Sequence, residues 1–575
     1  MVSLTIDNQT VEVPAGTTIL EAARKIGIQI PTLCAMPEIH HTPGACRICV
    51  VEVDRSRTLV ASCVYPVAPG MKVKTNSARV RKGREAMVEF LLSDHPQDCT
   101  ICQKNGNCEL QNLAALVGVR EIRVPQTDFT THRIDDSSSA LIRDTSKCIN
   151  CLRCVTACAD VQGVCLLTPE GRGFESKVVP AMGKNLADSA CTYCGQCAIV
   201  CPTGAIVERD DTDRVFAALE DPAKHVVVQQ APAIRASLGE EFGMPPGSLV
   251  TGRMIAALRR LGFNKVFDTN FTADLTIIEE GHELLQRVKT GGKLPMITSC
   301  SPGWIKFIEH FYPDLLSHVS TCKSPQQMFG ALAKTYYAEF SGIDPKDIFV
   351  TSIMPCTAKK YEAARPEMRS SGYQDVDAVL TTRELSRMIR KAGIDFVNLA
   401  PEEFDAPMGK YTGAATIFGT TGGVMEAALR TVYAVVSGQV LPSLDITEVR
   451  GLEGVKEAAV QVGELGQVRV AVAHGLANAR KLLERIVEGT ANYHFIEIMS
   501  CPGGCVGGGG QPLPASDEKR VLRAKALYAD DAGVQEFRQS HENPAIKLLY
   551  ETYLGKPLGE RSHKLLHTHY VERGI

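Results

Sequence analysis

Apolar and polar residues alternate along residues 2–13, VSLTIDNQTVEV, and predict a β-hairpin at the beginning of the chain. Asp7 and Asn8 interrupt the alternation and supply a polar turn. Thr18 then stands three residues before Glu21, which is the spacing of a helix-capping box, and the apolar residues around them share one helical face. The first part of the chain is therefore expected to fold as strand, strand and helix.

The pattern changes near residue 223, where short apolar runs begin to alternate with helical periodicity. VVVQQAPAIRASLGEEF, residues 226–242, starts as a buried strand and continues as a helix. KLPMITSC, residues 293–300, and DIFVTSIMPC, residues 347–356, are short strands that end directly in cysteine. Ligands of α/β domains lie beyond the carboxyl ends of the strands, so we expect a large α/β domain over residues 223–515 with a site at these cysteines.

Composition narrows the classes of function. The 575 residues are enough for several domains, and 44% hydrophobic with 22% charged residues is typical of globular proteins. A formal net charge of −3 argues against nucleic acid or an anionic membrane as the main partner. No apolar run reaches the length of a membrane span, and the first residues lack the features of a secretory signal. We therefore expect a cytoplasmic protein.

The 21 cysteines depart from this ordinary composition, because 16 of them lie before residue 202, most of them in tight groups. A reducing cytoplasm disfavours a framework of disulfides, which is the alternative interpretation. Repeated C-x2-C spacings in such a protein predict metal or iron–sulfur ligands. Cys165 stands outside every group and is expected to be a small buried residue.

The first cysteine group has the spacing C-x11-C-x2-C-x13-C. A [2Fe–2S] cluster requires four thiolates and a loop that can wrap around them, and this spacing supplies both. The candidate ligands are Cys34, Cys46, Cys49 and Cys63. Residues 1–78 resemble the β-grasp [2Fe–2S] ferredoxin domain at the start of the large electron-transfer subunit of respiratory complex I.

The second group, H-x3-C-x2-C-x5-C, lies in residues 79–120. Its candidate ligands are His95, Cys99, Cys102 and Cys108. Zinc also binds sets of three cysteines and one histidine, so the chemistry alone leaves zinc as an alternative. The resemblance to complex I implies a [4Fe–4S] cluster with one imidazole ligand. An ordinary surface histidine is the remaining alternative for His95.

Residues 138–210 contain the run C-x2-C-x2-C-x3-C twice, and Pro202 completes the second copy. Bacterial ferredoxins with two [4Fe–4S] clusters have this repeat, and the fourth cysteine of each run ligates the other cluster. The first predicted set is Cys148, Cys151, Cys154 and Cys201. The second predicted set is Cys191, Cys194, Cys197 and Cys158. These groups are expected to conduct electrons to a site further along the chain.

Three strings contain four of the five remaining cysteines: TSCSPGW at 298–304, MPCTAKK at 354–360 and EIMSCPGGCVGGGGQP at 497–512. They resemble, in order, the three signatures of [FeFe]-hydrogenases, and the resemblance extends over nearly all of residues 223–575. It implies an H-cluster, a [4Fe–4S] cube joined through a cysteine sulfur to a two-iron unit with CO, cyanide and a bridging dithiolate. It also implies that residues 516–575 are a helical segment similar to the family's small subunit.

The resemblance assigns roles to individual residues. The implied ligands of the H-cluster are Cys300, Cys356, Cys501 and Cys505. Lys359 matches the lysine that holds a cyanide ligand, which suits a cation beside an anion. Proton transfer is implied for Cys300, Glu280, Glu283, Ser320 and Arg287. For Glu280 and Glu283, three residues apart, a solvated helix face is the alternative. The implied cofactor pocket contains Pro232, Met354, Met499, Phe418, Gln326 and Ser301.

The first signature departs from the family, where two adjacent cysteines transfer protons and ligate the cube, respectively. Here the pair is Cys300 and Ser301, so strict register puts a serine at the ligand position. Ser301 would ligate as an alkoxide, a poor match for a soft iron–sulfur site. Alternatively Cys300 ligates by a local shift, which we favour, or Cys322 supplies the thiolate from a segment near the cluster in the family. An unreactive core cysteine is the other interpretation of Cys322.

The accessory clusters and the ending GERSHKLLHTHY resemble the catalytic subunit of multimeric NAD(P)-linked, electron-bifurcating hydrogenases. The implied reaction is 2H+ + 2e− ⇌ H2. No flavin or nicotinamide fingerprint stands in a strand–turn–helix setting, so a flavin- and iron–sulfur-containing, NAD(P)-linked partner subunit is expected, together with ferredoxin. The alternatives are a pure electron-transfer subunit, a scaffold in iron–sulfur assembly, or a sensory relative without high turnover.

Overall fold

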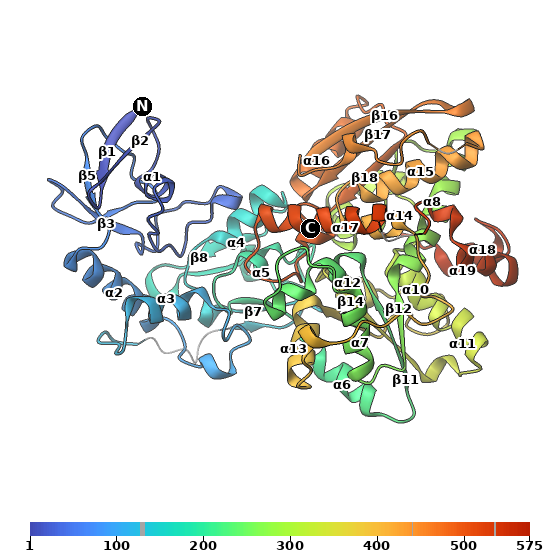
Figure 1. Cartoon of the computed structure of the whole chain (residues 1–575), viewed down its shortest axis with the longest axis horizontal. Coiled ribbons are helices and arrows are strands. Elements are labelled where there is room, and N and C mark those ends of the chain that lie inside the picture. Colours follow the sequence, from blue (N-terminus) through green and yellow to red (C-terminus); the bar gives the residue numbers. More distant parts are fainter. Residues whose placement is uncertain (127–132, 440, 534–535, 575) are drawn as a thin grey trace.

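The computed structural model describes residues 1–126, 133–439, 441–533 and 536–574. The molecule is elongated, with the N-terminal sheet at one end and the larger C-terminal region at the other (Figure 1). Segments that follow the N-terminal sheet in the sequence lie between the two ends. No helix in the described ranges combines the length and apolarity needed to cross a lipid bilayer.

A five-stranded sheet and one helix form the N-terminal domain, in the strand order β2-β1-β5-β3-β4. The predicted hairpin is confirmed, since β1 and β2 pair antiparallel with Val2 opposite Val13. The predicted capping box is also confirmed, because the Glu21 N–H donates to the Thr18 hydroxyl and the Thr18 N–H to the Glu21 carboxylate. The elements are β1 (Val2–Ile6), β2 (Gln9–Val13), α1 (Ile19–Lys25), β3 (Val50–Val53), β4 (Val60–Ala61) and β5 (Lys72–Lys74).

Short helices and small sheets carry the next cysteine groups. Helices α2 (Ala78–Ser93) and α3 (Glu109–Val117) pack together on either side of the His95 motif. The two ferredoxin-like repeats that follow each contribute one short helix, α4 or α5. The elements are β6 (Ile134–Asp135), β7 (Leu141–Asp144), α4 (Arg153–Thr156), β8 (Leu167–Glu170), β9 (Lys177–Pro180), α5 (Gln196–Val200) and β10 (Ile206–Glu208).

Two four-stranded sheets form the framework of the C-terminal region. The strands of β12-β11-β14-β15 are all parallel, whereas β13-β18-β17-β16 is parallel except for the edge strand β16. Their bounds are β11 (His225–Gln230), β12 (Lys265–Asp268), β13 (Met296–Ile297), β14 (Ile348–Met354), β15 (Ala378–Thr381), β16 (Val455–Val462), β17 (Gly466–His474) and β18 (Phe495–Met499). Parallel strands that alternate with helices confirm the predicted α/β fold.

Helices surround the two sheets, and α8 (Thr269–Thr290) runs through the core, buried along most of its length. The others are α6 (Thr212–Glu220), α7 (Thr251–Arg260), α9 (Pro302–Phe311), α10 (Pro325–Ala333), α11 (Tyr336–Ser341), α12 (Ala358–Ala363), α13 (Thr382–Lys391), α14 (Gly413–Thr416), α15 (Gly423–Ser437) and α16 (Leu476–Val487). The chain ends with α17 (Asp517–Gly533), α18 (Pro544–Leu549) and α19 (Glu560–Leu566). A buried ion pair of 2.6 Å between Arg523 and Glu240 joins α17 to the α/β body.

Candidate active site

The four thiols of the first cysteine group interact in two pairs. A hydrogen bond with the Cys46 thiol lowers the pKa of Cys34 to about 5, and a hydrogen bond with the Cys63 thiol lowers the pKa of Cys49 to about 6. Three of these four side chains are buried, and Cys46 is half-buried. The result is a compact donor set without a disulfide, which fits the two-iron cluster that the spacing predicts.

His95 is buried rather than exposed, so the interpretation as an ordinary surface histidine is wrong. Desolvation lowers the pKa of its ring to about 4, which keeps the imidazole neutral. Its Nδ1 atom has no hydrogen-bond partner among the described residues. The charge of Lys147 acts on the His95 ring, and Lys147 also interacts electrostatically with the Cys102 thiol. A neutral ring with a free nitrogen is the form in which histidine binds a metal.

Two cavities between α4, α5 and the small sheets are each lined by four cysteines. One cavity contains Cys148, Cys151, Cys154 and Cys201. The other contains Cys158, Cys191, Cys194 and Cys197. The fourth cysteine of each sequence run thus lines the cavity of the other run, and the structure brings together the two sets named from the sequence.

The cysteine sets follow one another along the molecule. The Arg153 guanidinium, next to the first cavity, donates a hydrogen bond of 3.4 Å to the Cys34 carbonyl of the N-terminal domain. At the other end, the Cys501 thiol lies 3.9 Å from the Cys194 carbonyl of the second cavity. A Cβ at Gly509 would lie only 2.5 Å from that same carbonyl, so the close approach of the two loops requires glycine.

Three thiols, that of buried Cys501 and those of half-buried Cys356 and Cys505, meet where strands β14 and β18 end. Cys356 follows β14, and Cys501 and Cys505 follow β18. Burial raises the pKa of Cys505 to about 12 and also raises the pKa of Cys356. The charges of Cys356 and Cys505 both act on Cys501. Such a set becomes anionic only beside positive metal ions, so its chemistry fits an iron–sulfur cluster.

Lys359 approaches these thiols and is held by a polar network. Its ammonium donates to the Cys300 carbonyl at 3.1 Å and to the Glu362 carboxylate at 2.9 Å. The Gln326 amide donates to the same carboxylate at 3.0 Å. The Lys359 charge also acts on Cys356 and Cys505. Gln326 therefore acts through Glu362 as a positioning residue for Lys359.

The three alternatives for the fourth ligand face different neighbours. They are Cys300, Ser301 and Cys322. The Cys300 thiol interacts with the charges of Glu280 and Lys359. The Ser301 hydroxyl lies 2.8 Å from the hydroxyl of Ser500, the residue before Cys501. The Cys322 thiol lies 3.9 Å from the Glu283 carboxylate instead.

A row of ionisable groups leads from Cys300 towards the surface along α8. Glu280 is fully buried, and this burial together with the charge of Glu283 raises the pKa of Glu280 to about 8. The Ser320 hydroxyl donates to Glu283 at 2.8 Å, and Arg287, with 14% of its side chain exposed, donates to Glu283 at 2.6 Å. Both glutamates are buried, so the interpretation as a solvated helix face is wrong.

Apolar side chains surround the inner end of this row. Phe418 and Met499 belong to one buried cluster, against which Cys300 packs. Met354, at the end of β14, belongs to the neighbouring apolar cluster, and Pro232 is buried at the start of the turn after β11. The five named side chains come from five different segments, and Phe418 and Met499 are the ones that pack in one cluster with Cys300.

Two charged residues near the site were not predicted from the sequence. Glu497 is buried in β18, and its carboxylate accepts the N–H groups of Gly422 and Met425 at the beginning of α15. Its charge acts on Cys505, and on Lys456, whose pKa burial lowers to about 8. A carboxylate inside the apolar run FIEIM was the available signal in the sequence.

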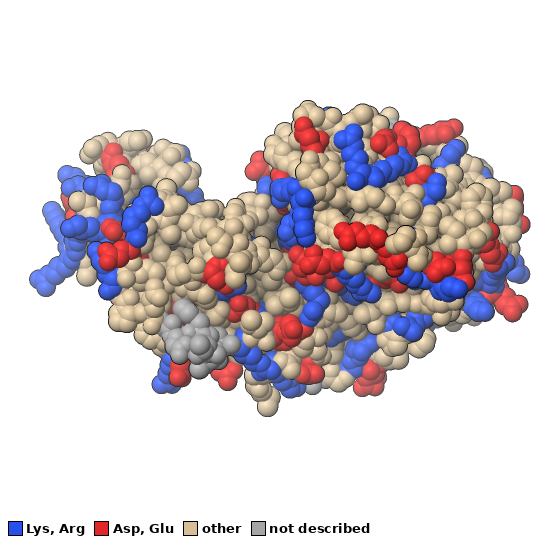
Figure 2. Space-filling view, turned by 90° about the horizontal axis from the view of Figure 1, so that it is seen from below, with Lys and Arg blue, Asp and Glu red and all other residues tan. Residues whose placement is uncertain are grey.

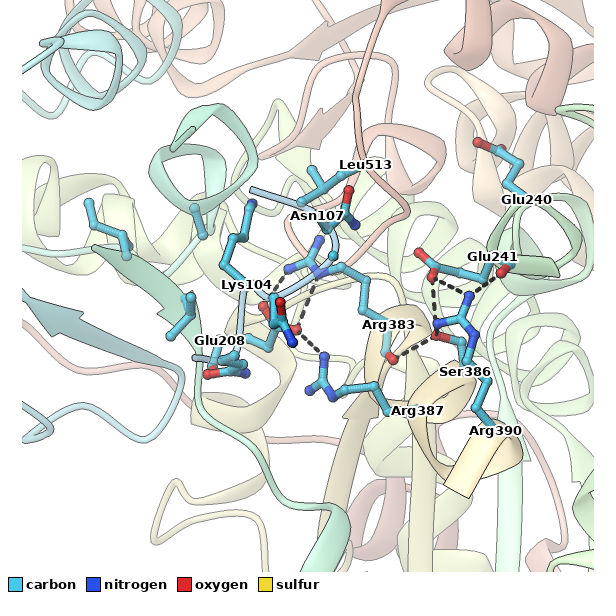
Figure 3. Close-up of a pocket in the computed structure, with 16 residues that line it drawn as sticks. Lys104, Asn107, Glu208, Glu240, Glu241, Arg383, Ser386, Arg387, Arg390 and Leu513 are labelled. Atoms are coloured by element: carbon cyan, nitrogen blue, oxygen red, sulfur yellow. Dashed lines mark hydrogen bonds and ion pairs between the residues drawn. The ribbon is translucent and has the colours of Figure 1, made fainter. Parts of the chain in front are cut away.

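A separate charged pocket lies where the cysteine-rich segments meet α13 (Figure 3). Its arginines are paired with carboxylates: Arg383 contacts Glu208 at 2.7 Å, and Arg387 contacts the same carboxylate at 3.1 Å. Arg390 pairs with Glu241 at 3.4 Å. The two pairs with Glu208 join the two-cluster segment to the α/β domain, and we assign the pocket no part in the chemistry.

Five family models match successive parts of the chain. Residues 224–509 match the C-terminal domain of the iron-only hydrogenase large subunit, and residues 517–573 match the iron hydrogenase small subunit. Residues 1–78 match a 2Fe-2S cluster-binding domain, residues 84–123 the NADH-ubiquinone oxidoreductase-G iron–sulfur binding region, and residues 147–205 a 4Fe-4S dicluster domain.

Individual relatives match the chain over 64% to 100% of its length. The chain is 54% identical over 584 aligned residues to the NADP-reducing hydrogenase subunit HndD of Solidesulfovibrio fructosivorans, covering 100% of this chain and 99% of that protein. It is 42% identical to iron hydrogenase 1 of Clostridium pasteurianum, covering 96% and 97%. A structure of [FeFe]-hydrogenase HydA1 from Chlamydomonas reinhardtii superposes with a TM-score of 0.57 at 45% identity, over 64% of this chain and 100% of that one.

Proposed function

The chain belongs to the iron-only, or [FeFe]-, hydrogenase family, and we propose that it is the catalytic subunit of a multimeric, NAD(P)-linked, electron-bifurcating hydrogenase. It catalyses the reversible formation of H2 from protons and electrons, and its N-terminal iron–sulfur domains relay the electrons. The observation that carries the proposal is the meeting of three thiols with Lys359 at the inner end of a row of cysteine sets.

We propose one [2Fe–2S] cluster, three accessory [4Fe–4S] clusters and one H-cluster. When bound, the H-cluster supplies the redox chemistry of H2 with its iron, CO, cyanide and dithiolate groups. Cys356, Cys501 and Cys505 would hold it, and the Lys359 ammonium would face its anionic ligands. Phe418 and Met499 exclude water from the pocket, which strengthens the electrostatic interactions inside it.

In the proposed proton path, Cys300 exchanges protons with Glu280, and Ser320 connects Glu280 to Glu283 near the surface. Glu280, with a pKa of about 8, can both hold and release a proton near neutral pH. This role for Cys300 leaves Ser301 as our proposed occupant of the fourth ligand position, which differs from the ligation by Cys300 favoured above. The hydrogen bond of Ser301 to Ser500, next to Cys501, supports this choice.

Partner subunits are proposed to exchange electrons at the N-terminal end. Lys and Arg side chains gather at one end of the molecule in Figure 2, and exposed basic residues of the N-terminal domain and α2 include Arg47, Arg55, Arg57, Arg79, Arg81 and Lys82. Such a surface favours an acidic partner through electrostatic steering. The proposed partners are a flavin- and iron–sulfur-containing NAD(P)-linked subunit and ferredoxin, in the cytoplasm.

The second candidate is a sensory or electron-transfer subunit without high turnover, and the serine at position 301 is the observation that favours it. H2-dependent reduction of a viologen dye by the anaerobically matured chain tests the two. Rapid reduction with infrared bands of bound CO and cyanide supports the hydrogenase. A fully loaded cluster that turns over slowly, with Ser301→Cys restoring a high rate, would contradict it in favour of the sensory role.

A further inference from the structure

Three metal-ligating side chains of different kinds lie together beside the proposed proton path. The Glu283 carboxylate, the Cys322 thiol and the His567 ring each contribute one ligand atom, and these atoms lie within 4.8 Å of one another. All three residues are buried. They come from α8, from the segment before α10 and from the end of α19, and none belongs to the cysteine sets described above.

Backbone pairing aligns two of these ligands. Cys322 and His567 face each other in an antiparallel bridge. Hydrogen bonds flank the bridge on both sides, from the Lys323 N–H to the Leu566 carbonyl at 2.7 Å and from the Thr568 N–H to the Thr321 carbonyl at 2.8 Å. Directly opposed residues hold their Cβ atoms close together, so the main chain brings the thiol and the imidazole together.

We propose that one Zn2+ ion, or a similar borderline divalent cation, binds between Glu283, Cys322 and His567 and reversibly blocks proton transfer. Thiolate, imidazole and carboxylate are the three protein ligands of zinc, and a set of three leaves a fourth position for water. Tetrahedral zinc would draw the ligand atoms together by about 1 Å. As the Zn–S bond forms, the thiol proton of Cys322 leaves to solvent, and nothing is oxidised or reduced.

The ion would block the path because it competes for an atom that the path uses. The Glu283 Oε2 atom accepts the Ser320 hydroxyl at 2.8 Å, and the same atom lies 3.9 Å from the Cys322 sulfur. A cation bound to this oxygen removes the acceptor of Ser320. The effect on turnover therefore rests on the proposed proton path, whereas the binding of the ion does not.

The site lies beside an exposed histidine, and hydrogen bonds hold its own histidine in place. The His567 ring stacks on the exposed ring of His563, with centroids 4.7 Å apart. Its nitrogens lie 2.8 Å from the Thr321 hydroxyl and 3.2 Å from the Glu279 carboxylate. Replacing Cys322 with alanine removes a weak 3.9 Å contact of its thiol and one sulfur atom from the buried apolar cluster, a small change with which this variant is expected to fold.

The test uses the anaerobically matured protein, titrated with zinc chloride. Zinc and iron are counted per chain, the zinc environment is measured by X-ray absorption, and H2 formation is followed with reduced viologen. The variants are Cys322→Ala and His567→Gln. Cys165→Ala serves as the control, because Cys165 is a free cysteine and is exposed, so the buried position expected from the sequence is wrong. Each variant is compared with its own zinc-free rate.

We expect one zinc per chain with a single sulfur ligand at about 2.3 Å, loss of most of the turnover, and recovery with a chelator. Cys322→Ala and His567→Gln should weaken the inhibition by about 10- to 100-fold, whereas Cys165→Ala should not. The proposed zinc site would be overturned if Cys322→Ala bound as much zinc as the wild type, or if the bound zinc had no sulfur ligand. The proposed block of proton transfer would be overturned if zinc bound as expected and turnover did not fall. The zinc-free rate tests the hydrogenase itself, so the two proposals fail separately.

Discussion

The N-terminal cysteine sets and the C-terminal site differ in what surrounds their thiols. The two ferredoxin cavities are lined mainly by cysteines and apolar residues. The C-terminal thiols lie among buried charges, namely Glu280, Glu497 and Lys359. Electrons need only short distances between clusters, whereas protons need ionisable groups in hydrogen-bond reach of one another. The difference therefore separates a region that conducts electrons from one that must also move protons.

The largest effect is expected from Cys505→Ala. Removing this thiol should abolish H2 turnover and lower the iron content, because one of the three cysteines that would hold the H-cluster is lost. Cys34→Ala, in the N-terminal domain, is the matched control and should keep dye-linked turnover. Activity assays and iron analysis of the two proteins check the comparison, and equal loss of turnover in both would contradict it.

Glu280→Gln should lower turnover by about 100-fold, because glutamine cannot hold and release a proton. The infrared bands of bound CO and cyanide should remain. Glu279→Gln is the neighbouring control, since Glu279 accepts hydrogen bonds from Ser562 and the Leu558 N–H rather than facing Cys300. A Glu280 variant as active as the Glu279 variant would argue against the path.

His95→Cys should leave dye-linked turnover unchanged and lower the reduction potential of its cluster. The buried imidazole is neutral, with a pKa of about 4, and a thiolate in its place adds one negative charge. Redox titration followed by electron paramagnetic resonance measures the shift. Zinc instead of iron at this site, or a potential that does not move, would contradict the assignment of His95 as a cluster ligand.

The smallest effect on turnover is expected from Asp274→Asn, which should change only the pH dependence of stability. Burial raises the pKa of Asp274 from 3.8 to about 6. Between these values the folded protein binds more protons than the unfolded chain, so stability falls as pH rises, by up to about 1.4 kcal/mol per pH unit from this residue. The variant should lack this contribution.

Thermal unfolding of the wild type and of Asp274→Asn between pH 4 and 8 measures the effect. The control is Asp135→Asn in the two-cluster segment. Desolvation opposes ionisation of Asp135, yet hydrogen bonds from Ser137 and Leu186 lower its pKa below the ordinary 3.8. Its contribution to stability is therefore lost only as the pH falls below that ordinary pKa. The contrast between the two regions would be contradicted if both substitutions changed the pH dependence of stability in the same way.

The sequence predicted the hairpin, the first capped helix, the α/β body and the cysteine sets. Each depends on residues close together in the chain: alternation over residues 2–13, the Thr18–Glu21 spacing, or runs of four cysteines within eleven residues. Local spacing is sufficient there because one loop or one turn holds most of the ligands.

Tertiary structure alone decided the surroundings of Cys300, Ser301 and Cys322. Their roles depend on Glu280, Ser500 and Glu283, and Ser500 lies 199 residues away from Ser301 in the chain. The pairing of Cys322 with His567 likewise joins segments that share no sequence pattern. Burial raises the energy of an unpaired charge, and only the packed fold determines which polar groups remain to stabilise it.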